Sequence, residues 1–169
     1  MTTLNFDMIL DVNKGEAWKV IADFAGISVF HPAVPKSYAI NQSERSGLGA
    51  ERRCELSNDG KKYIDERIIR FVDGKEYDVV IYGGNQMPPV NNLIVTIGIQ
   101  ELANKHIRVY LQANYQPKYG PIGTVMNLMM IKPFLSKAMN GILLGFKHYM
   151  ESGQPVQSFG TLQAAGLFA

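Results

Sequence analysis

Six segments in which apolar and polar residues alternate follow one another along the middle of the chain, and each is separated from the next by a short turn sequence. Alternation with a period of two is typical of β-strands that bury one face. The turns contain Gly, Pro, Asn and Asp and are too short to hold a crossover helix, so the pattern predicts an antiparallel meander. We place its strands near residues 36–43, 49–57, 62–72, 75–83, 91–102 and 106–116.

The segments before this meander predict one more strand and two short helices. Residues 2–12 alternate in the same way. Residues 14–24 carry apolar side chains at helical spacing, and Asn13 with an acidic residue three positions later has the pattern of a capping box. A second helical turn over 27–30 must end before Pro32, because the residue preceding a proline is disfavoured in the α region.

The segment after the meander is predicted to be helical. Residues 133–151 carry one apolar stripe at a spacing typical of an α-helix, and residues 122–131 are predicted to be helical too, with a break or kink near Pro133. We expect this helix to pack against the sheet. The chain is then a single α+β domain over residues 1–152, followed by a tail, 153–169, that is mobile or lies against a neighbouring subunit.

Composition and charge exclude several classes of protein. The chain has 169 residues, of which 46% are hydrophobic and 19% charged, and its net charge is +2, a balance typical of a globular domain. Lys and Arg are scattered rather than gathered in a stripe, so we expect no nucleic-acid partner. No apolar run is long enough to cross a membrane. The N-terminal residues lack the features of a signal peptide, so we expect a cytoplasmic protein.

Cysteine and histidine are too few and too dispersed to form a metal centre. Cys54 is the only cysteine, and His31, His106 and His148 lie far apart without ligand spacing, so we expect no metal and no cofactor. Cys54 is most simply a small buried apolar residue. His31 has two interpretations: it caps the short helix, which is the simpler one, or it acts as a general acid or base at a pocket mouth.

The first hairpin of the meander can be put in register from its turn. If Gly60 takes the left-handed position of a three-residue loop, Arg52 faces Glu66 and Cys54 faces Ile64. A two-residue loop would instead set Cys54 opposite a charged side chain and mix an apolar face with a charged one. We prefer the three-residue loop, because the buried face fixes register.

The second hairpin extends the same face. Asp73-Gly74 suits a two-residue turn. Pairing outward from that turn places Tyr77, Val79 and Ile81 on the same face as Glu66. This face is therefore predicted to be the concave, inward face of the sheet.

The third hairpin is treated in the same way, with Asn104-Lys105 as a two-residue turn. This register pairs Ile99 with Tyr110 and places Ile97 on the inward face beside them. It also turns outward an apolar row that would favour a homodimer surface, namely Ile107, Val109 and Leu111.

The Arg52–Glu66 pair on an otherwise apolar face has two interpretations. It is either an ion pair near the sheet rim that fixes register, or a polar anchor for the head group of a ligand. Ligand sites are mostly apolar with a few placed polar groups, and a buried ion pair is by itself weak evidence for stability.

Short segments in a fixed order carry a resemblance to a known superfamily. They are Ala17–Phe24, Phe30-His31-Pro32, Gly47–Arg52, Asp59-Gly60, Glu66-Arg67-Ile68, Tyr77, Pro88–Asn92 and Leu144–Glu151. Over about residues 2–152, this order resembles the START-like superfamily, also called SRPBCC, and specifically its polyketide cyclase/dehydrase-like branch. The superfamily also contains birch-pollen-allergen-like proteins and START lipid-transfer domains.

The resemblance implies a helix-grip fold of β-α-α-β6-α type, in which an antiparallel sheet of about seven strands wraps around a long C-terminal helix with an internal apolar cavity. Members bind or transfer lipids, hormones, pigments or polyketides, and some are cyclases or hydrolases, so the fold does not fix one activity. Phe30 and Tyr110 stand where relatives often have Trp. The identity of the ligand therefore cannot be carried over.

Two functions are consistent with these features. The leading hypothesis is binding, or transport, of a small hydrophobic molecule such as a lipid, an aromatic or a polyketide-like compound. In the alternative, a cyclase, dehydratase or hydrolase uses the same cavity, in which Glu66 or His31 moves a proton and Arg52 stabilises an oxyanion. The predicted ligand-binding residues are Phe30, His31, Arg52, Glu66, Tyr77, Ile81, Ile97, Tyr110, Met126, Met130 and Phe134.

Overall fold

A computed structural model describes residues 1–168 and contains one seven-stranded antiparallel sheet in the order β1-β7-β6-β5-β4-β3-β2. The six central segments form the predicted meander, and the N-terminal strand pairs with the last one, so the two ends of the chain's β region meet. The strands are β1 (Thr2–Leu10), β2 (Lys36–Ala39), β3 (Glu51–Glu55), β4 (Tyr63–Val72), β5 (Glu76–Gly84), β6 (Val90–Glu101) and β7 (Ile107–Pro117).

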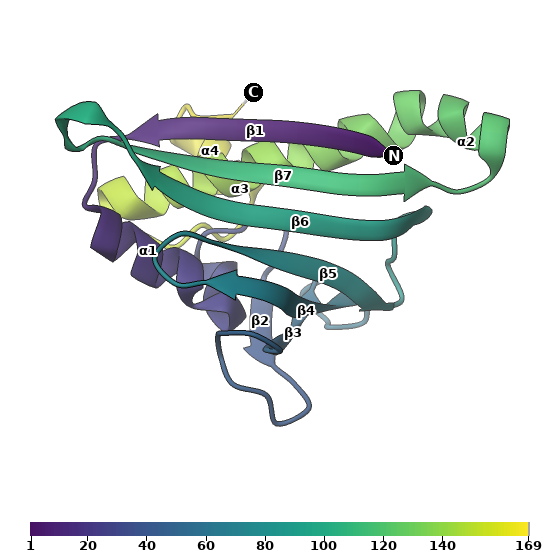
Figure 1. The fold of residues 1–169 in the computed structure, drawn as a ribbon, viewed down its shortest axis with the longest axis horizontal. Coiled ribbons are helices and arrows are strands. Elements are labelled where there is room, and N and C mark those ends of the chain that lie inside the picture. Colours follow the sequence, from purple (N-terminus) through teal and green to yellow (C-terminus); the bar gives the residue numbers. More distant parts are fainter. Residues whose placement is uncertain (169) are drawn as a thin grey trace.

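Helices cover one face of this sheet. In Figure 1 the strands form a curved layer, and the long helix α3 lies behind it. The antiparallel sheet and the long C-terminal helix confirm the predicted α+β fold. The helices are α1 (Lys14–Ala22), the 3-10 turns η1 (Phe24–Val29) and η2 (Ala103–Lys105), α2 (Gly120–Met126), the π-helical turn η3 (Asn127–Ile131), α3 (Lys132–Ser152) and α4 (Phe159–Ala164).

Local signals in the sequence explain where two of these helices begin. Asn13 caps α1, because its side chain accepts a hydrogen bond from the backbone N–H of Glu16 at 3.1 Å. The break expected near Pro133 takes the form of η3, in which the backbone N–H of Lys132 bonds the carbonyl of Asn127. In a regular α-helix the ring of a proline clashes with a backbone carbonyl of the preceding turn. A wider π turn relieves this clash.

The core lies between the inner face of the sheet and α3. Along α3 the buried side chains follow the predicted stripe, at Leu135, Met139, Ile142 and Phe146. The helix approaches closely at Gly145, where an added Cβ would lie 1.9 Å from the carbonyl oxygen of residue 30. Only glycine permits this contact, which brings α3 against η1 and closes one end of the space beneath the sheet.

The first hairpin has the predicted register. Gly60 has a φ of +69° and occupies the left-handed position of the loop. Arg52 pairs with Glu66, and Cys54 pairs with Ile64. The prediction that these side chains share the inward face is confirmed.

The second hairpin reaches the predicted faces by a different route. The turn is a three-residue loop in which Gly74 has a φ of +71° and Val72 pairs with Glu76. The predicted two-residue turn is therefore wrong. A β-bulge after Ile68 then shifts the ladder by one residue, so that Ile68 faces Val79 as predicted.

The third hairpin differs from the prediction by one residue from Glu101 back to Ile94, and an irregularity between Asn91 and Ile94 then shifts the ladder by one residue more. Ile99 pairs with Val109, and Tyr110 pairs with Gly98 on the outer face. The cause is a longer connection that includes η2, with Lys105 at a φ of +64°. Because the side-chain period of a strand is two, this slip moves the side chains of β7 between Ile107 and Asn114 to the face opposite to the predicted one, whereas those of β6 keep their predicted face.

This slip also removes the basis for a dimer surface on β7. The row that was predicted to face outward is buried, with exposed fractions of 0% for Ile107, 3% for Val109 and 1% for Leu111. The prediction that this row forms a homodimer surface is therefore wrong, since its side chains belong to the core.

The C-terminal tail packs on its own chain over the described residues. Val156 is 2% exposed and donates its backbone N–H to the carbonyl of Val29, and Leu162 of α4 is fully buried. Phe159 lies against α3 beside Gly141, where it would block a side chain at that position. The tail thus covers the outside of α3 near η1.

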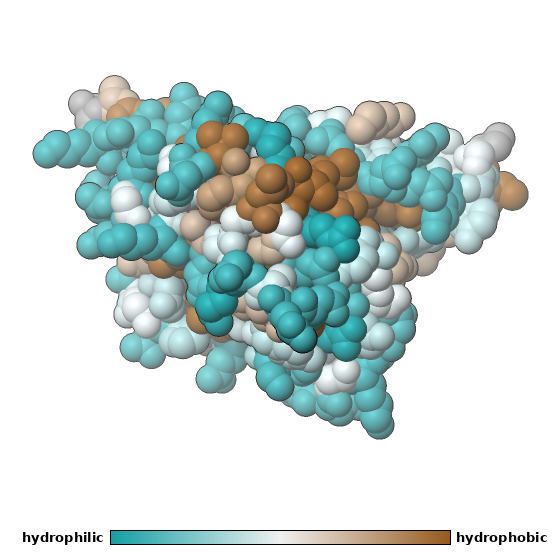
Figure 2. Space-filling view, turned by 60° about the horizontal axis from the view of Figure 1, so that its bottom comes forward, coloured by the Kyte–Doolittle hydropathy of each residue, from teal (hydrophilic) through white to brown (hydrophobic). Residues whose placement is uncertain are grey.

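The molecular surface is mostly hydrophilic on the face shown in Figure 2, and the largest group of hydrophobic residues on that face lies above its centre. Among the described residues, no helix is long and apolar enough to cross a membrane.

Candidate functional site

A cavity of about 130 Å³ lies between the inner face of the sheet and the first half of α3. Its walls come from strands β3 to β6, from the connection between η1 and β2, and from α3. Of the 21 lining residues, 16 are apolar. Such a chamber favours an apolar occupant, and its few polar side chains decide how that occupant is oriented.

Arg52 and Glu66 supply the charged groups of this cavity. Nε of Arg52 lies 2.5 Å from Oε2 of Glu66, and the two side chains are only 3% and 10% exposed. Nη1 of Arg52 donates to the backbone carbonyl of Phe24 at 2.5 Å, and the guanidinium lies 4.0 Å from the centre of the Phe24 ring. Burial acts to lower the pKa of Arg52, but the Glu66 carboxylate raises it above its ordinary value.

Two polar atoms of this ion pair make no hydrogen bond with the described protein. Hydrogen bonds occupy Nε and Nη1 of Arg52 and Oε2 of Glu66, but not Nη2 of Arg52 or Oε1 of Glu66. Every fully buried side-chain nitrogen and oxygen of the described residues has a partner. We infer that these two atoms border the open space of the cavity, which both residues line.

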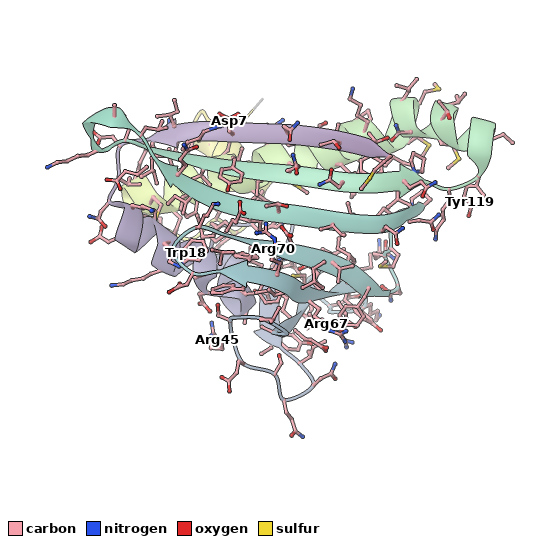
Figure 3. The ribbon with its side chains drawn as sticks, in the orientation of Figure 1. Asp7, Trp18, Arg45, Arg67, Arg70 and Tyr119 are labelled. Carbon is pink, nitrogen blue, oxygen red and sulfur yellow. The ribbon has the colours of Figure 1, made fainter. Side chains whose placement is uncertain are left out.

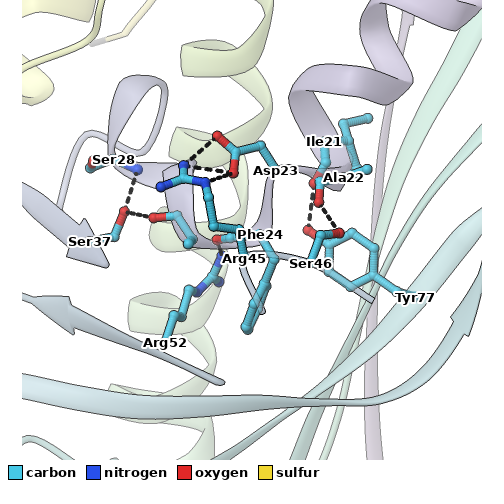
Figure 4. Close-up of polar contacts among 11 residues, drawn as sticks. Ile21, Ala22, Asp23, Phe24, Ser28, Ser37, Arg45, Ser46, Arg52 and Tyr77 are labelled. Atoms are coloured by element: carbon cyan, nitrogen blue, oxygen red, sulfur yellow. Dashed lines mark hydrogen bonds and ion pairs between the residues drawn. The ribbon is translucent and has the colours of Figure 1, made fainter. Parts of the chain in front are cut away.

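A network of surface contacts fixes the backbone carbonyl that Arg52 binds (Figure 4). The carboxylate of Asp23, next to Phe24, accepts two hydrogen bonds at 2.8 Å from Nη2 of Arg45. The hydroxyl of Ser46 donates to the carbonyl of Ala22. The loop between β2 and β3 therefore holds the end of α1, and with it the carbonyl that orients the guanidinium.

Cys54 lies beside the ion pair but is not an activated nucleophile. Its thiol donates to Oε2 of Glu66 at 3.3 Å. Burial raises the pKa of Cys54 well above its usual value, the negative charge of Glu66 raises it further, and the cation of Arg52 only partly opposes both effects. The thiol therefore stays protonated and acts as a small side chain and weak donor.

His31 lines the cavity as a neutral imidazole. Its Nδ1 accepts a hydrogen bond from the backbone N–H of Ala33 at 3.1 Å, so the proton of the neutral ring sits on Nε2. Burial in apolar surroundings and the nearby charge of Arg52 lower the pKa of His31 to about 3. The ring fixes the turn between η1 and β2 and is a weak base at neutral pH.

The structure brings six of the eleven predicted ligand-binding residues to the cavity wall, which are His31, Arg52, Glu66, Ile81, Ile97 and Phe134. Phe30 and Tyr77 lie in the core next to it. Phe30 packs edge-on against Phe146 at 5.4 Å, and the hydroxyl of Tyr77 donates to the carbonyl of Ile21 at 2.9 Å. These two side chains support the wall without lining the cavity.

The other three predicted residues lie elsewhere. Tyr110 is on the outer face of the sheet, where its hydroxyl donates to Glu76. Arg70, labelled in Figure 3, forms ion pairs with Glu76 and Asp78. Met126 and Met130 do not line the cavity, and Met130 is 65% exposed. The register error explains the position of Tyr110. Met126 ends α2 and Met130 lies on the outward side of η3, so neither reaches the cavity.

Sequence reasoning missed several residues that do line the cavity. Leu135, Met139 and Ile142 were recognised as the apolar stripe of the helix but were not assigned to the site. The same stripe is the signal that could have found them, because a helix that packs across a curved sheet presents its buried face to the enclosed space. Gln86 and Pro88 also line the cavity, from the loop that joins β5 and β6.

Comparison with known proteins gives a family match over most of the chain. The model of a family described as polyketide cyclase/dehydrase and lipid transport matches residues 1–151. No curated protein sequence matches the chain.

Several solved structures share the fold. The protein XoxI from Bacillus cereus has 19% identity and a TM-score of 0.71, covering 90% of this chain and 97% of its own. Ara h 8.0201 has 16% identity and a TM-score of 0.66, covering 89% and 98%. The di-domain ARO/CYC BexL has 16% identity and a TM-score of 0.69, covering 89% of this chain and 47% of its own. At such identities the likeness establishes the helix-grip fold alone.

Proposed function

The chain belongs to the polyketide cyclase/dehydrase and lipid-transport family, and from this premise we propose that it binds a small, mostly apolar molecule in the cavity beneath its sheet. Arg52 and Glu66 hold one polar group of that molecule. The observation that carries the proposal is the ion pair itself, buried in an apolar chamber with one donor and one acceptor left unused. The cytoplasmic location expected from the sequence stays a prediction.

The chemistry of the pair selects the polar group. Nη2 of Arg52 offers a donor, and Oε1 of Glu66 offers an acceptor. The two charges cancel, so a charged ligand would enter an apolar site without a counter-charge of its own. An uncharged group that both accepts and donates, such as a hydroxyl, a phenol or a carboxamide, satisfies both atoms.

The size of the cavity limits the ligand or requires motion. Ligand pockets for drug-sized molecules usually measure about 300–1,000 Å³, and this cavity measures about 130 Å³. A compact ring system fits with little change. A ligand with a long hydrocarbon chain fits only if the cavity opens beside Phe134. The side chain of Phe134 lines the cavity and is 64% exposed.

Binding is favoured over catalysis by the state of the cavity side chains. A general base works best with a pKa near the working pH, whereas the pKa of His31 is lowered to about 3. The thiol of Cys54 stays protonated because its pKa is raised. The alternative of a cyclase, dehydratase or hydrolase would leave Glu66 as the remaining acid–base candidate, already engaged with Arg52.

The proposal can be tested by blocking the cavity. Ala138 lines it from α3, so Ala138→Phe fills part of the space. Ser136→Phe is the matched control, because this residue is half-buried on the same helix, as Ala138 is, but does not line the cavity. Ligands are sought by native mass spectrometry of the purified protein and by thermal shift with hydroxylated and carboxamide-bearing aromatic and aliphatic compounds.

We expect a bound compound to raise the melting temperature of the wild type and of Ser136→Phe, but much less that of Ala138→Phe. An equal shift in all three proteins would place the ligand elsewhere. A wild type that carries no ligand and responds to no compound would contradict the proposal.

A further inference from the structure

An arm of the molecule, residues 119–134, carries an unusual concentration of exposed apolar side chains. It comprises α2, η3 and the first turn of α3, and in Figure 1 α2 projects past the end of the sheet. Half of the exposed large hydrophobic side chains of the described chain, 7 of 14, lie within it. They are Tyr119, Ile122, Val125, Leu128, Met129, Met130 and Phe134, which are 56–75% exposed. Figure 3 labels Tyr119 at this end of the molecule.

The polarity of the arm is inverted relative to a normal surface helix. Asn127, a polar residue, is turned inward, where its Oδ1 accepts a hydrogen bond of 2.7 Å from the hydroxyl of the buried Tyr115. The neighbouring Leu128 and Met129 point to the outside, at 62% and 75% exposure. A helix that only packs on its own core does the opposite, so the outward apolar side is suited to an apolar environment beyond the molecule.

The charge around the arm is positive. The chain has no Asp or Glu between Glu101 and Glu151, a stretch that contains six Lys and Arg residues. Lys118 directly precedes the arm and Lys132 lies within it, both accessible.

We propose that the arm docks the protein on an anionic lipid surface, with its apolar side chains inserted among the acyl chains and its lysines at the head groups. Interfacial helices combine these two features, apolar insertion and Lys or Arg at the rim. In this proposal the arm lies in the surface, and no described helix is both long and apolar enough to span a bilayer. Charge complementarity selects this occupant over a second copy, since two such arms facing each other would bring their lysines together.

Docking would also place the cavity entrance at the lipid surface. Phe134 belongs to the arm and lines the cavity. The π turn η3 separates α2 from α3, and such turns often mark functional sites in helices. The docking surface does not depend on what the cavity holds, so the two proposals can fail independently.

The test is co-sedimentation of the full chain with phosphatidylcholine vesicles and with vesicles that also contain phosphatidylglycerol. We expect binding to the anionic vesicles, lost at high salt. Met129→Asp is expected to weaken this binding about tenfold or more. Leu48→Asp is the control, because Leu48 is as exposed, at 73% against 75%, but lies in the loop between β2 and β3. Lys118→Gln with Lys132→Gln is expected to weaken binding about 30-fold.

Three outcomes would overturn the proposal. They are no binding to either vesicle, equal binding to neutral and anionic vesicles, and equal loss of binding in the Leu48 and Met129 variants. Light scattering checks whether the arm instead binds a second copy of the chain. A dimer of the wild type that Met129→Asp dissociates would assign the arm to a second copy of the chain. Thermal melting of each variant verifies that it is folded.

Discussion

Arg52 and Glu66 face each other across β3 and β4, and their side chains meet inside a cavity whose walls are otherwise almost entirely apolar. Each charge is compensated by the other, and the carbonyl of Phe24 accepts a further hydrogen bond from Arg52. Because both side chains are nearly inaccessible to water, neither could remain charged without this arrangement. The pair therefore affects both the stability of the β3–β4 pairing and the chemistry that a ligand meets.

Removing one partner of this pair should destabilise the protein more than removing both. In Glu66→Gln the cation of Arg52 remains buried without its counter-charge, and we expect the free energy of unfolding to fall by about 3–5 kcal/mol. In the double variant Arg52→Met with Glu66→Leu no charge is left in the cavity, so we expect a loss of at most about 1 kcal/mol. Urea denaturation of the three proteins measures these differences.

The same variants separate stability from binding. The double variant keeps the apolar wall but has lost the donor and the acceptor, so a ligand held by its polar group should bind it about 10-fold more weakly or worse. Arg70→Met on the outer face also breaks ion pairs, with Glu76 and Asp78, but far from the cavity. It is the control and should keep full affinity. A double variant with wild-type affinity would show that the pair has only a structural role.

His31 should make the stability depend on pH in a defined window. Burial and the charge of Arg52 lower its pKa from 6.5 to about 3 in the folded state. Below pH 6.5 the unfolded chain takes up a proton that the folded protein refuses, so the unfolded state binds more protons and stability decreases as the pH falls. The expected slope approaches about 1.4 kcal/mol per pH unit between about 6 and 3 and vanishes above about 7.

The measurement is the free energy of unfolding between pH 7.5 and 4, for the wild type and for His31→Gln. Carboxylates contribute their own dependence at the acid end, so the difference between the two proteins isolates the histidine. A difference that stays constant over this range would show that the imidazole takes up its proton as readily in the folded state as in the unfolded one.

The register of the sheet could be predicted where glycine marks the turn. Gly60 and Gly74 both take a left-handed conformation, the first in the predicted loop and the second in a loop one residue longer. A β-bulge after Ile68 then restored the predicted faces. In the third hairpin Lys105 takes the left-handed position, which a lysine rarely does. The sequence carries no local sign of this conformation, so the inward face of β7 was assigned to the wrong residues.

The candidate site was predictable to the extent that it depends on register. The positions of Arg52 and Glu66 follow from one turn, and the structure places them in the cavity. Met126 and Met130 depend instead on how α2 and η3 sit relative to the sheet. Helical spacing alone cannot distinguish an apolar stripe that faces the core from one that faces outward, and here Asn127 is the residue turned inward.

Tyr110 provides a direct test of the corrected register. Its ring lies across Gly98, where an added Cβ would come within 2.2 Å of the ring, and its hydroxyl donates to Glu76 on the outer face. Tyr110→Phe should lower the free energy of unfolding by about 0.5–1.5 kcal/mol through the lost hydrogen bond. It should leave ligand affinity unchanged, because the residue does not line the cavity. Isothermal titration calorimetry with a cavity ligand measures this affinity, and a weaker affinity of Tyr110→Phe would contradict the corrected register.

The close approach of α3 to η1 yields the final prediction. A methyl group at position 145 would collide with the carbonyl of residue 30, since the built Cβ lies 1.9 Å from that oxygen. A backbone atom cannot rotate away as a side chain does, so Gly145→Ala must shift the helix, and we expect it to destabilise the protein by about 1–3 kcal/mol. Asn140→Ala, an exposed position on the same helix, is the control and should change stability by less than about 0.5 kcal/mol. Because α3 forms one wall of the cavity, the shifted helix should also change ligand affinity. If neither the stability nor the ligand affinity of Gly145→Ala differed from that of the wild type, the helix would tolerate the methyl group without moving.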